Sequence, residues 1–386
     1  MKGRIAIAGI GETAVGKLPG ITPMEHAADA AMRAVADAGL SLADIDGLVA
    51  CNAMAQPWMY PGEATAEYLG LSPAFCLGLG AGGATALAVL RHAGNALLDE
   101  TCNAVLVTMG DALRTGLSRE QARAVQSSAG HPEFETPFGP TAPALYALAA
   151  RAHMAERGST AEQFAAVAVA AHAHAARHPG AERREPITLD DVLASRMIAD
   201  PLHLLDCSLV SDGGAAIVLT RAERALDLPR PPVYLLGIGE GHGHEHISQA
   251  PSLTRTHARD SGRRAFAMAG LAPRDVDIAG LYDCFTPVVL MLLEDLGLVP
   301  EFEAGDFVMA GGIGPGGELP VNTHGGLLAH AHPGNPGSMF HLTETVAQLR
   351  GDAGDRQVEG ARIALVHAQG GTLSSHCTAL LGREVP

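Results

Sequence analysis

The sequence predicts a large α/β protein made of two similar halves that flank an insertion. The chain has 386 residues, of which 47% are hydrophobic and only 4% aromatic, so its core must consist mainly of aliphatic side chains. The strand-like run IAIAGIG (5–11) has a counterpart in VYLLGIG (233–239), and a glutamate follows each. Downstream, DAGLSLADIDGL (37–48) matches MAGLAPRDVDIA (268–279). A repeat of this length indicates a duplicated α/β half rather than a solenoid.

The elements of the first half carry clear local signals. Thr22 and Glu25 form a capping box with a proline at the first helical position, and Gly39 ends the helix. Alanines recur between them at helical spacing, which predicts a helix packed tightly in a layer. The runs NAVLVTMG (103–110) and RIALVHAQGG (362–371) are apolar and end in glycine, as buried strands do.

The second half repeats these signals. Gly270 and Asp277 take the places of Gly39 and Asp46 in the repeat. A later helix opens at Thr286, again with a proline at its first position. Two copies of one strand–helix–strand unit are therefore expected.

The insertion divides the chain into four segments. We expect residues 1–111 to form the first part of the N-terminal half, 112–210 a loop or cap domain, 211–230 the end of that half, and 231–386 the C-terminal half. The insertion contains two helix patterns, FGPTAPALYALAARAHMAERG and the Ala/His-rich EQFAAVAVAAHAHAARH. Such a segment is expected to cap the mouth of the duplicated core and to shape a substrate tunnel.

Charge and composition exclude several classes of function. The formal net charge of −16 argues against nucleic acid or an anionic membrane as a partner. An anionic ligand would need local basic positions, for which Arg183, Arg184 and Arg196 are candidates, although they are equally explained as solvated surface arginines. We see no signal peptide, no apolar run of about 18 residues, and no metal or disulfide spacing among the six cysteines. A cytoplasmic protein with reduced thiols is expected.

Two groups of histidines need an interpretation. The Ala-rich helix carries three that we expect at the surface: His172, His174 and His178. Another three alternate along GHGHEHIS, which could place them on one strand face: His242, His244 and His246. Because they follow a strand end, a polar loop near the pocket or a dimer contact is the favoured interpretation of this second group. No metal site is predicted.

Three further blocks carry a family resemblance. They are SRMIADPLHLLDCSLVSDGGAAIVLT (195–220), YDCFTP (282–287) and NTHGGLLAHAHP (322–333). In this order, on a duplicated frame, they resemble the thiolase superfamily of the sterol-carrier and lipid-transfer-protein type. The resemblance implies a five-layer αβαβα sandwich of two halves with an inserted loop domain. It also implies a homodimer or tetramer that binds acyl-CoA, with the coenzyme A thioester as substrate and no other cofactor.

The resemblance also shows what this chain lacks. Where a thiolase would place its nucleophilic cysteine, in GLGAGGATAL, this chain has Gly80. A thiol at a helix N-terminus ionises more easily, but glycine offers no side chain, so a covalent acyl-enzyme is excluded at this position. Cys76 lies four residues earlier in a strand-like run, where a small thiol is ordinary core filling.

The expected catalytic residues follow from the same blocks. Tyr282 stands where sterol-carrier-type thiolases carry histidine, and it resembles the steroid side-chain retro-aldolases, which also lack the cysteine. Those aldolases place a second tyrosine where this chain keeps His332, so the pattern is a hybrid. Cys284 resembles the acid/base cysteine of the thiolases, or it is a small buried residue. The pocket is expected to include His324, Gly325, Gly326, His367, Gly370 and Gly371, with a structural role as the alternative for both histidines.

The chemistry fits this set. Retro-aldol cleavage removes a proton from a β-hydroxyl and stabilises a thioester enolate, and neither step needs a nucleophile. A phenol with a pKa of about 10 is a poor free base at neutral pH, so Tyr282 is expected to donate a hydrogen bond or to relay a proton to a histidine. His332 and the N–H groups near Gly334 and Gly337 would hold the enolate oxygen.

Three hypotheses are consistent with these residues. The first is an enzyme that cleaves a β-hydroxyacyl-CoA without forming a covalent intermediate. The second is an acyltransferase that uses another thiol. The third is an acyl-CoA-binding subunit that a partner completes. The resemblance implies such a partner, a small acyl-CoA-binding protein with an OB-fold and a zinc ribbon.

Overall fold

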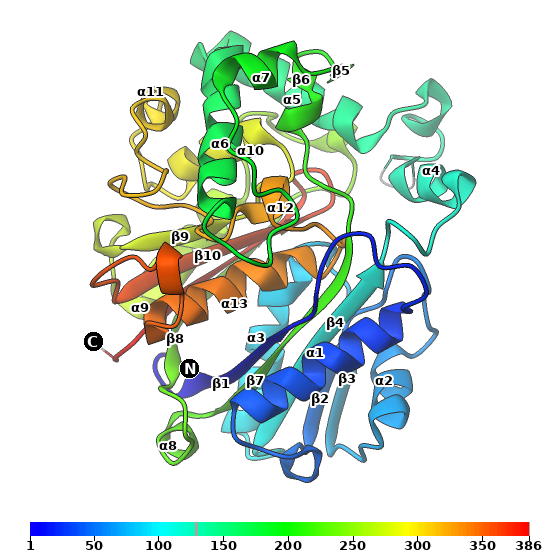
Figure 1. The fold of residues 1–386 in the computed structure, drawn as a ribbon, viewed down its shortest axis with the longest axis vertical. Helices are drawn as coiled ribbons and strands as arrows, with labels where there is room; N and C mark the ends of the chain where they lie inside the picture. Colours follow the sequence, from blue (N-terminus) through cyan, green and yellow to red (C-terminus); the bar gives the residue numbers. More distant parts are fainter. Residues whose placement is uncertain (128–129, 386) are drawn as a thin grey trace.

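The computed structural model describes residues 1–127 and 130–385 (Figure 1). Nine of its described strands form one large mixed sheet in the order β3-β2-β4-β7-β1-β8-β11-β10-β9, and a separate two-stranded sheet lies in the segment between β4 and β7. The bounds are β1 (Ile5–Glu12), β2 (Gly47–Ala50), β3 (Phe75–Gly78), β4 (Ala104–Ala112), β7 (Asp212–Arg221), β8 (Val233–His242), β9 (Ile278–Leu281), β10 (Ile363–Gly370) and β11 (Ser375–Gly382).

The predicted duplication is present in the strand pairing. In the first half, β7 lies antiparallel to both β1 and β4, and β4 is parallel to β2. In the second half, β11 lies antiparallel to both β8 and β10, and β10 is parallel to β9. The antiparallel pair β1–β8 joins the two halves into one sheet.

Corresponding residues have the same structural role in each half. Gly39 and Gly270 both end their helices with φ near +70°, a left-handed conformation that favours glycine. An Asp46 carboxylate oxygen accepts the backbone N–H of Ala104 at 2.9 Å, at the start of β4. In the second half, Asp277 accepts the N–H of Ile363 at 2.8 Å, at the start of β10. The two halves therefore share these backbone contacts as well as the sequence pattern.

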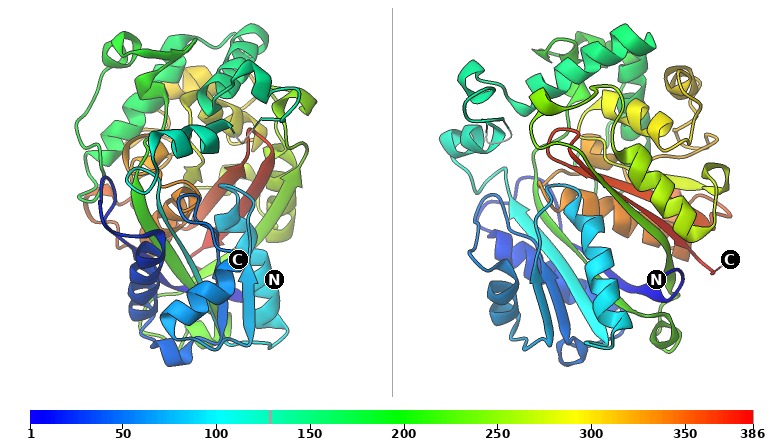
Figure 2. Two further views of the ribbon diagram at one scale, coloured as in Figure 1. Left: turned by 90° about the vertical axis from the view of Figure 1, so that its right-hand side faces the viewer. Right: turned by 180° about the vertical axis from the view of Figure 1, so that it is seen from behind.

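The helices form the layers of the sandwich (Figures 1 and 2). On one outer side lie α1 (Pro23–Asp37) and α2 (Pro61–Leu69), and α9 (Ala258–Ala269) covers β8 and β11 on the other. Between the halves lie α3 (Thr85–Leu98) and α13 (Gly337–Arg350), which contact each other and strands of both halves. α10 (Thr286–Asp295) packs between α9 and the insertion. This arrangement is the five-layer sandwich expected from the sequence.

The repeated Gly-Ile-Gly has a packing cause. A Cβ atom built on Gly9 would lie 2.2 Å from the carbonyl oxygen of Ala34 in α1, and one on Gly237 would lie 2.2 Å from that of Ala265 in α9. Each helix thus sits directly on the strand backbone, where no side chain fits. The predicted capping box of α1 is also formed, since Thr22 and Glu25 exchange hydrogen bonds.

The segment between β4 and β7 forms a cap at one end of the molecule, shown at the top of Figure 1. It packs against α10 and against two helices of the second half. The cap elements are α4 (Arg119–Ser127), α5 (Ala142–Arg157), α6 (Ala161–Ala175), α7 (Leu189–Ala194), β5 (Met197–Ala199) and β6 (Leu202–His203). The other helices are α8 (Ala222–Ala225), α11 (Ala304–Met309) and α12 (Gly326–Ala329). The short 3-10 helices are η1 (Leu42–Asp44), η2 (Thr136–Phe138), η3 (Leu204–Asp206), η4 (Ile247–Gln249), η5 (Pro273–Asp275) and η6 (Gly354–Arg356).

One prediction about the cap is wrong. His172, His174 and His178 were expected at the surface, but they are buried, with at most 9% of each residue exposed. The reason is that α6 packs against α7 on one side and against α10, α11 and α12 on others, so it has no open face. His174 Nε2 lies 3.0 Å from the carbonyl oxygen of Ile313, and His172 Nδ1 lies 2.9 Å from that of Glu185. In the part of the chain that the structure describes, no helix combines the length and the hydropathy needed to cross a membrane.

Candidate active site

A chain of hydrogen bonds connects two of the predicted catalytic residues. The hydroxyl oxygen of Tyr282, just after β9, lies 3.3 Å from Nε2 of His332. The other ring nitrogen of His332, Nδ1, lies 2.8 Å from the hydroxyl oxygen of Ser208. His332 and Ser208 are half-buried, whereas Tyr282 is buried. The fold thus brings together residues that are 124 and 50 positions apart.

Burial fixes the protonation states of this chain of groups. It raises the pKa of Tyr282 well above its usual value and lowers the pKa of His332 to about 4. At neutral pH the tyrosine is therefore a phenol and the histidine is uncharged. In the tautomer that carries the imidazole proton on Nδ1, Tyr282 donates to Nε2 and the Nδ1–H donates to Ser208.

Ser208 is a site residue that sequence reasoning did not identify. Its segment runs beside that of His332, because Ser211 and His332 exchange backbone contacts: Ser211 N donates to the His332 carbonyl oxygen at 3.2 Å, and His332 N donates to the Ser211 hydroxyl at 3.2 Å. The block 195–220 carries the family resemblance. Nothing in the spacing showed which of its serines would reach the histidine.

The loop before α3 contains Gly80, and it lies against Tyr282. A Cβ on Gly83 would lie 2.6 Å from the Tyr282 hydroxyl, and a Cβ on Gly370 would lie 1.8 Å from the Ala81 carbonyl oxygen. Those two glycines are required by close packing. Gly80 itself is exposed, and a Cβ there would meet nothing within 4 Å. The expected nucleophile position therefore has open space but no side chain.

The N-terminus of α13 lies beside His332. A Cβ on Gly337, the first residue of this helix, would lie 2.9 Å from Cδ2 of His332. The Ser338 hydroxyl donates to the Gly83 carbonyl oxygen, which ties the helix to the Gly80 loop. The partial positive charge of the helix end favours an anion forming next to His332.

Cys284 lies in a second, fully buried polar group. Burial raises the pKa of its thiol to about 12, so the thiol is protonated. Gln369 Nε2 lies 3.7 Å from the Cys284 sulfur and donates to the Tyr146 hydroxyl at 2.8 Å. Tyr146 in turn donates to the Gly371 carbonyl oxygen at 3.0 Å. Tyr146 comes from the cap and was not expected from sequence.

The remaining expected pocket residues have packing roles in the structure. His367 is buried within β10, with its ring nitrogens 2.9 Å from Thr378 and 3.1 Å from His376, which is the structural alternative that the sequence left open. His324 is 2% exposed and lies among other buried histidines. Gly325 and Gly326 both have positive φ, and a Cβ on Gly326 would lie 2.0 Å from a carboxylate oxygen of Asp283.

Cys76 and the histidine-rich loop also have clear places. Cys76 lies in β3, and its sulfur would be 2.9 Å from a Cβ on Gly62, so it fills a helix–strand contact. His242, His244 and His246 do not converge. His242 Nδ1 lies 3.2 Å from the Ser375 hydroxyl, His244 Nε2 lies 3.0 Å from the Thr372 carbonyl oxygen, and His246 stacks edge-on against His131.

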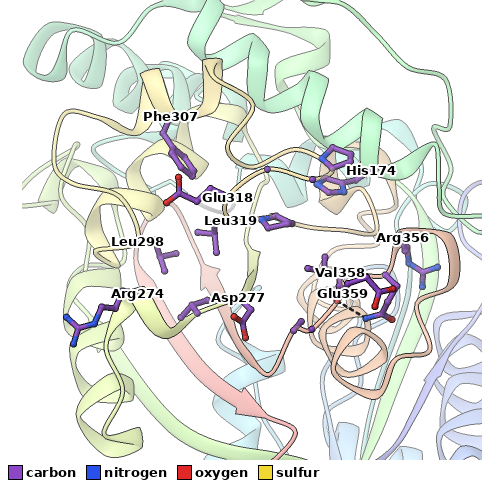
Figure 3. A pocket seen from close by; sticks show the side chains of 18 of the residues that line it. His174, Arg274, Asp277, Leu298, Phe307, Glu318, Leu319, Arg356, Val358 and Glu359 are labelled. Atoms are coloured by element: carbon purple, nitrogen blue, oxygen red, sulfur yellow. Dashed lines mark hydrogen bonds between the residues drawn. The ribbon is translucent and has the colours of Figure 1, made fainter.

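A large cavity of about 690 Å³ lies away from this site, at the edge of the sheet formed by β9 (Figure 3). Its lining includes Arg274 and Asp277 at one end and His174 and Arg356 at the other. None of the predicted catalytic or pocket residues lines it. Cavity size alone would therefore point to a different part of the molecule.

The chain is similar to several known proteins. A family model described as "Thiolase C-terminal domain-like" matches residues 239–383. An acetyl-CoA acetyltransferase of Methanothermobacter thermautotrophicus is 35% identical over 95% of this chain and 96% of its own. This chain belongs to the thiolase superfamily. A 17-hydroxy-3-oxo-4-pregnene-20-carboxyl-CoA lyase of Mycobacterium tuberculosis is 36% identical, with 97% of this thiolase homologue and 98% of the lyase covered.

A solved structure shows the same relation. The Ltp2-ChsH2(DUF35) aldolase is 36% identical to this thiolase homologue and superposes with a TM-score of 0.87, covering 99% of this chain and 98% of the aldolase chain. Its relatives are thus named both for acyl transfer and for carbon–carbon cleavage. The chain is an enzyme of the thiolase superfamily, and the residues of its site bear on which of the two reactions it catalyses.

Proposed function

We propose that this enzyme cleaves a β-hydroxyacyl-CoA by a retro-aldol reaction, without forming a covalent acyl-enzyme. The observation that carries the proposal is the combination of an empty nucleophile position at Gly80 with a hydrogen-bonded Tyr282–His332 pair next to the same loop. The similarity to a carboxyl-CoA lyase and to an aldolase supports it. Catalysis then depends on moving protons around a stabilised enolate.

The proposed reaction begins at the β-hydroxyl. Tyr282 accepts the substrate hydroxyl proton while it passes its own proton to Nε2 of His332, 3.3 Å away. The Cα–Cβ bond breaks, a carbonyl forms at Cβ, and the electron pair moves into the thioester enolate. This coupled transfer avoids a free phenolate, which burial of Tyr282 makes costly.

The enolate is then protonated at its α-carbon. The imidazolium of His332 and the N-terminus of α13 stabilise the negative oxygen until that step. The proton comes either back from His332 through Tyr282 or from Cys284, whose thiol is then reprotonated by the His332 imidazolium. The products are a carbonyl compound and a shortened acyl-CoA, and the enzyme returns to its starting state.

Acyl transfer through another thiol is the second candidate, because one relative is named an acetyltransferase. The pKa values of two candidate thiols, Cys51 and Cys207, argue against it. Cys51 lies next to Thr85 at the start of α3, but burial raises its pKa to about 12. Burial also raises the pKa of Cys207 to about 12. Such thiols are protonated at neutral pH and are poor nucleophiles.

Turnover of a β-hydroxyacyl-CoA tests the proposal, measured as carbonyl product with and without the expected small zinc-ribbon partner. We expect Tyr282→Phe to lower kcat by about 10²- to 10⁴-fold, because the relay loses its hydroxyl. Tyr234→Phe, in β8 and away from the site, is the matched control and should leave kcat unchanged. Intact mass after incubation with acyl-CoA should show no acyl adduct on the wild-type chain.

Each alternative has its own signature in these experiments. A stable adduct on wild type, with no carbonyl product, would support acyl transfer. Saturable coenzyme A binding without any turnover in the presence of the partner would identify a non-catalytic subunit. Equal activity of wild type and Tyr282→Phe would remove Tyr282 from the mechanism.

We also propose that the chain works as an assembly. A structural relative is named as an Ltp2-ChsH2(DUF35) aldolase, which is consistent with the expected small partner. A homodimer or tetramer is supported by the open edge of β3 and by large apolar side chains exposed near it, which include Trp58, Met59, Tyr60 and Tyr68. Light scattering of the purified chain, alone and with the partner, measures the stoichiometry.

A further inference from the structure

A cluster of buried histidines lies behind the His332 segment and has no role in the reaction proposed above. The rings of His178 and His330 are 4.6 Å apart, and those of His330 and His324 are 5.1 Å apart. His330 and His324 are each 2% exposed. Within residues 1–127 and 130–385, neither ring nitrogen of either residue has a hydrogen-bond partner. Buried nitrogens in this state call for a ligand.

Glu12 supplies a carboxylate to this cluster. It ends β1, and one of its oxygens accepts the hydroxyl proton of Thr343. One donor atom from each of Glu12, His178 and His330 lies within 4.8 Å of the others, and no other such group is found among the described residues. A tetrahedral zinc site needs donor atoms about 3.4 Å apart, so small side-chain rotations close it.

The duplicated half shows what is unusual about Glu12. Its counterpart, Glu240, forms an ion pair with Arg91 at 2.7 Å. Glu12 has no ion-pair partner in the described chain and faces two imidazoles instead. The first half therefore keeps the acidic residue of the repeat but not the arginine, and a bound cation would take the place of that positive charge.

We propose that Glu12, His178 and His330 bind a divalent cation of the zinc class, with water as a fourth ligand. Two imidazoles and a carboxylate are ligands that Zn²⁺ prefers, and neutral histidine is the binding form. Glu12 lies in β1, His178 follows the cap helix α6, and His330 follows α12, so the ion joins the first half, the insertion and the second half. The site is structural, and it holds the segment that leads to His332.

Binding of the cation by His178 breaks one hydrogen bond. Gly180 N donates to Nδ1 of His178 at 2.9 Å, which places the proton of that ring on Nε2. A cation bound by His178 displaces this arrangement, and the Gly180 hydrogen bond is lost. The segment that follows stays anchored, because Glu182 N and Arg183 N donate to the carbonyl oxygens of His330 and Ala329 at 3.0 and 2.9 Å.

Calorimetric titration of the untagged, chelator-treated full chain with Zn²⁺ tests the site. We expect one equivalent to bind, and Glu12→Gln and His330→Gln each to weaken binding by about 100-fold or more. Glu240→Gln is the matched control in the other half and should leave the affinity unchanged. His244→Ala controls for the histidine-rich loop and should also leave the affinity unchanged.

Anomalous diffraction at the zinc edge locates the ion in the wild-type chain and does not depend on how the variants fold. A peak between Glu12, His178 and His330 is the expected result, and the chelated chain should melt several degrees lower than the zinc-loaded one. Zinc affinity unchanged in Glu12→Gln, binding lost in His244→Ala, or ordered water in place of an anomalous peak would each overturn the proposal.

Discussion

At the scale of single residues, the decisive feature is that the site lacks a nucleophile but has space for one. Gly80 precedes α3, whose N-terminus favours a thiolate, and a side chain there would meet no atom within 4 Å. The backbone at Gly80 does not adopt the left-handed conformation that would strain other residues. The loss of the cysteine is thus chemical and not steric.

This leads to a gain-of-function prediction. Gly80→Cys should form an acyl adduct when incubated with acetyl-CoA, because it restores a thiol in the loop that leads into α3 and contacts Tyr282. Intact-protein mass spectrometry measures the added acyl mass. Gly80→Ser is the control and should remain unmodified, since its hydroxyl is a weaker nucleophile. An adduct of equal yield on wild type would mean that a native thiol is the acceptor.

Ser208 is a positioning residue, since it acts through His332. Ser208→Ala should lower kcat for β-hydroxyacyl-CoA cleavage by about 10- to 100-fold, because the Nδ1–H of His332 loses its acceptor at 2.8 Å and the ring is no longer held for Tyr282. Ser208→Thr keeps the hydroxyl and should restore most of the activity. If the alanine and threonine variants lose equal activity, packing rather than the hydrogen bond explains the effect.

At the scale of elements, two loops that come from different halves fit together through glycines. The Gly80 loop precedes α3, and Gly370 ends β10. A Cβ on Gly370 would lie 1.8 Å from the Ala81 carbonyl oxygen, which is a backbone atom that cannot rotate away. The contact places the C-terminal loop next to Tyr282.

The same substitution should therefore have different effects in the two loops. Gly370→Ala should lower the free energy of unfolding by about 1–3 kcal/mol, since it overpacks a backbone contact. Gly80→Ala should change it by less than about 0.5 kcal/mol, because the new methyl group points into open space. Urea denaturation of both variants gives the comparison. Equal losses would mean that the loops are not in contact as described.

At the scale of the whole molecule, buried histidines make the fold sensitive to acid. Burial lowers the pKa of His153 to about 4 and the pKa values of His341 and His376 to about 3. A folded pKa below the unfolded value near 6.5 means that stability is complete above pH 6.5 and is lost as pH falls toward the folded value. Asp283 has the opposite effect on the free energy of unfolding. Burial raises its pKa to about 7, so its contribution to stability is lost as the pH rises toward that value.

His153 offers a clean test of this acid sensitivity. Its Nδ1 lies 2.9 Å from the Ser159 hydroxyl, and Arg157 and Glu156 are the charged groups that act on it. Between pH 6.5 and 4 it should remove about 3 kcal/mol from the free energy of unfolding. His153→Gln should flatten the decline measured by urea denaturation at pH 7 and pH 5. His92→Gln, on an exposed position of α3, should leave the decline unchanged.

The sequence by itself determined the frame of this protein. Close backbone packing and tight turns require the Gly-Ile-Gly runs, the helix-ending glycines and the paired aspartates. Both halves therefore show these residues in their sequences. The glycine at the nucleophile position and the Tyr282 and His332 blocks could be recognised for the same reason. Each lies in a short continuous motif.

Only the tertiary structure decided which side chains meet. Ser208 reaches His332 across 124 residues, and Tyr146 of the cap reaches Gly371 across 225. His172, His174 and His178 were wrongly expected at the surface, because the alanine-rich sequence of α6 has no clear apolar stripe that would show how many of its faces are covered. Burial depends on the neighbours that folding brings to a residue, and those neighbours come from distant parts of the chain.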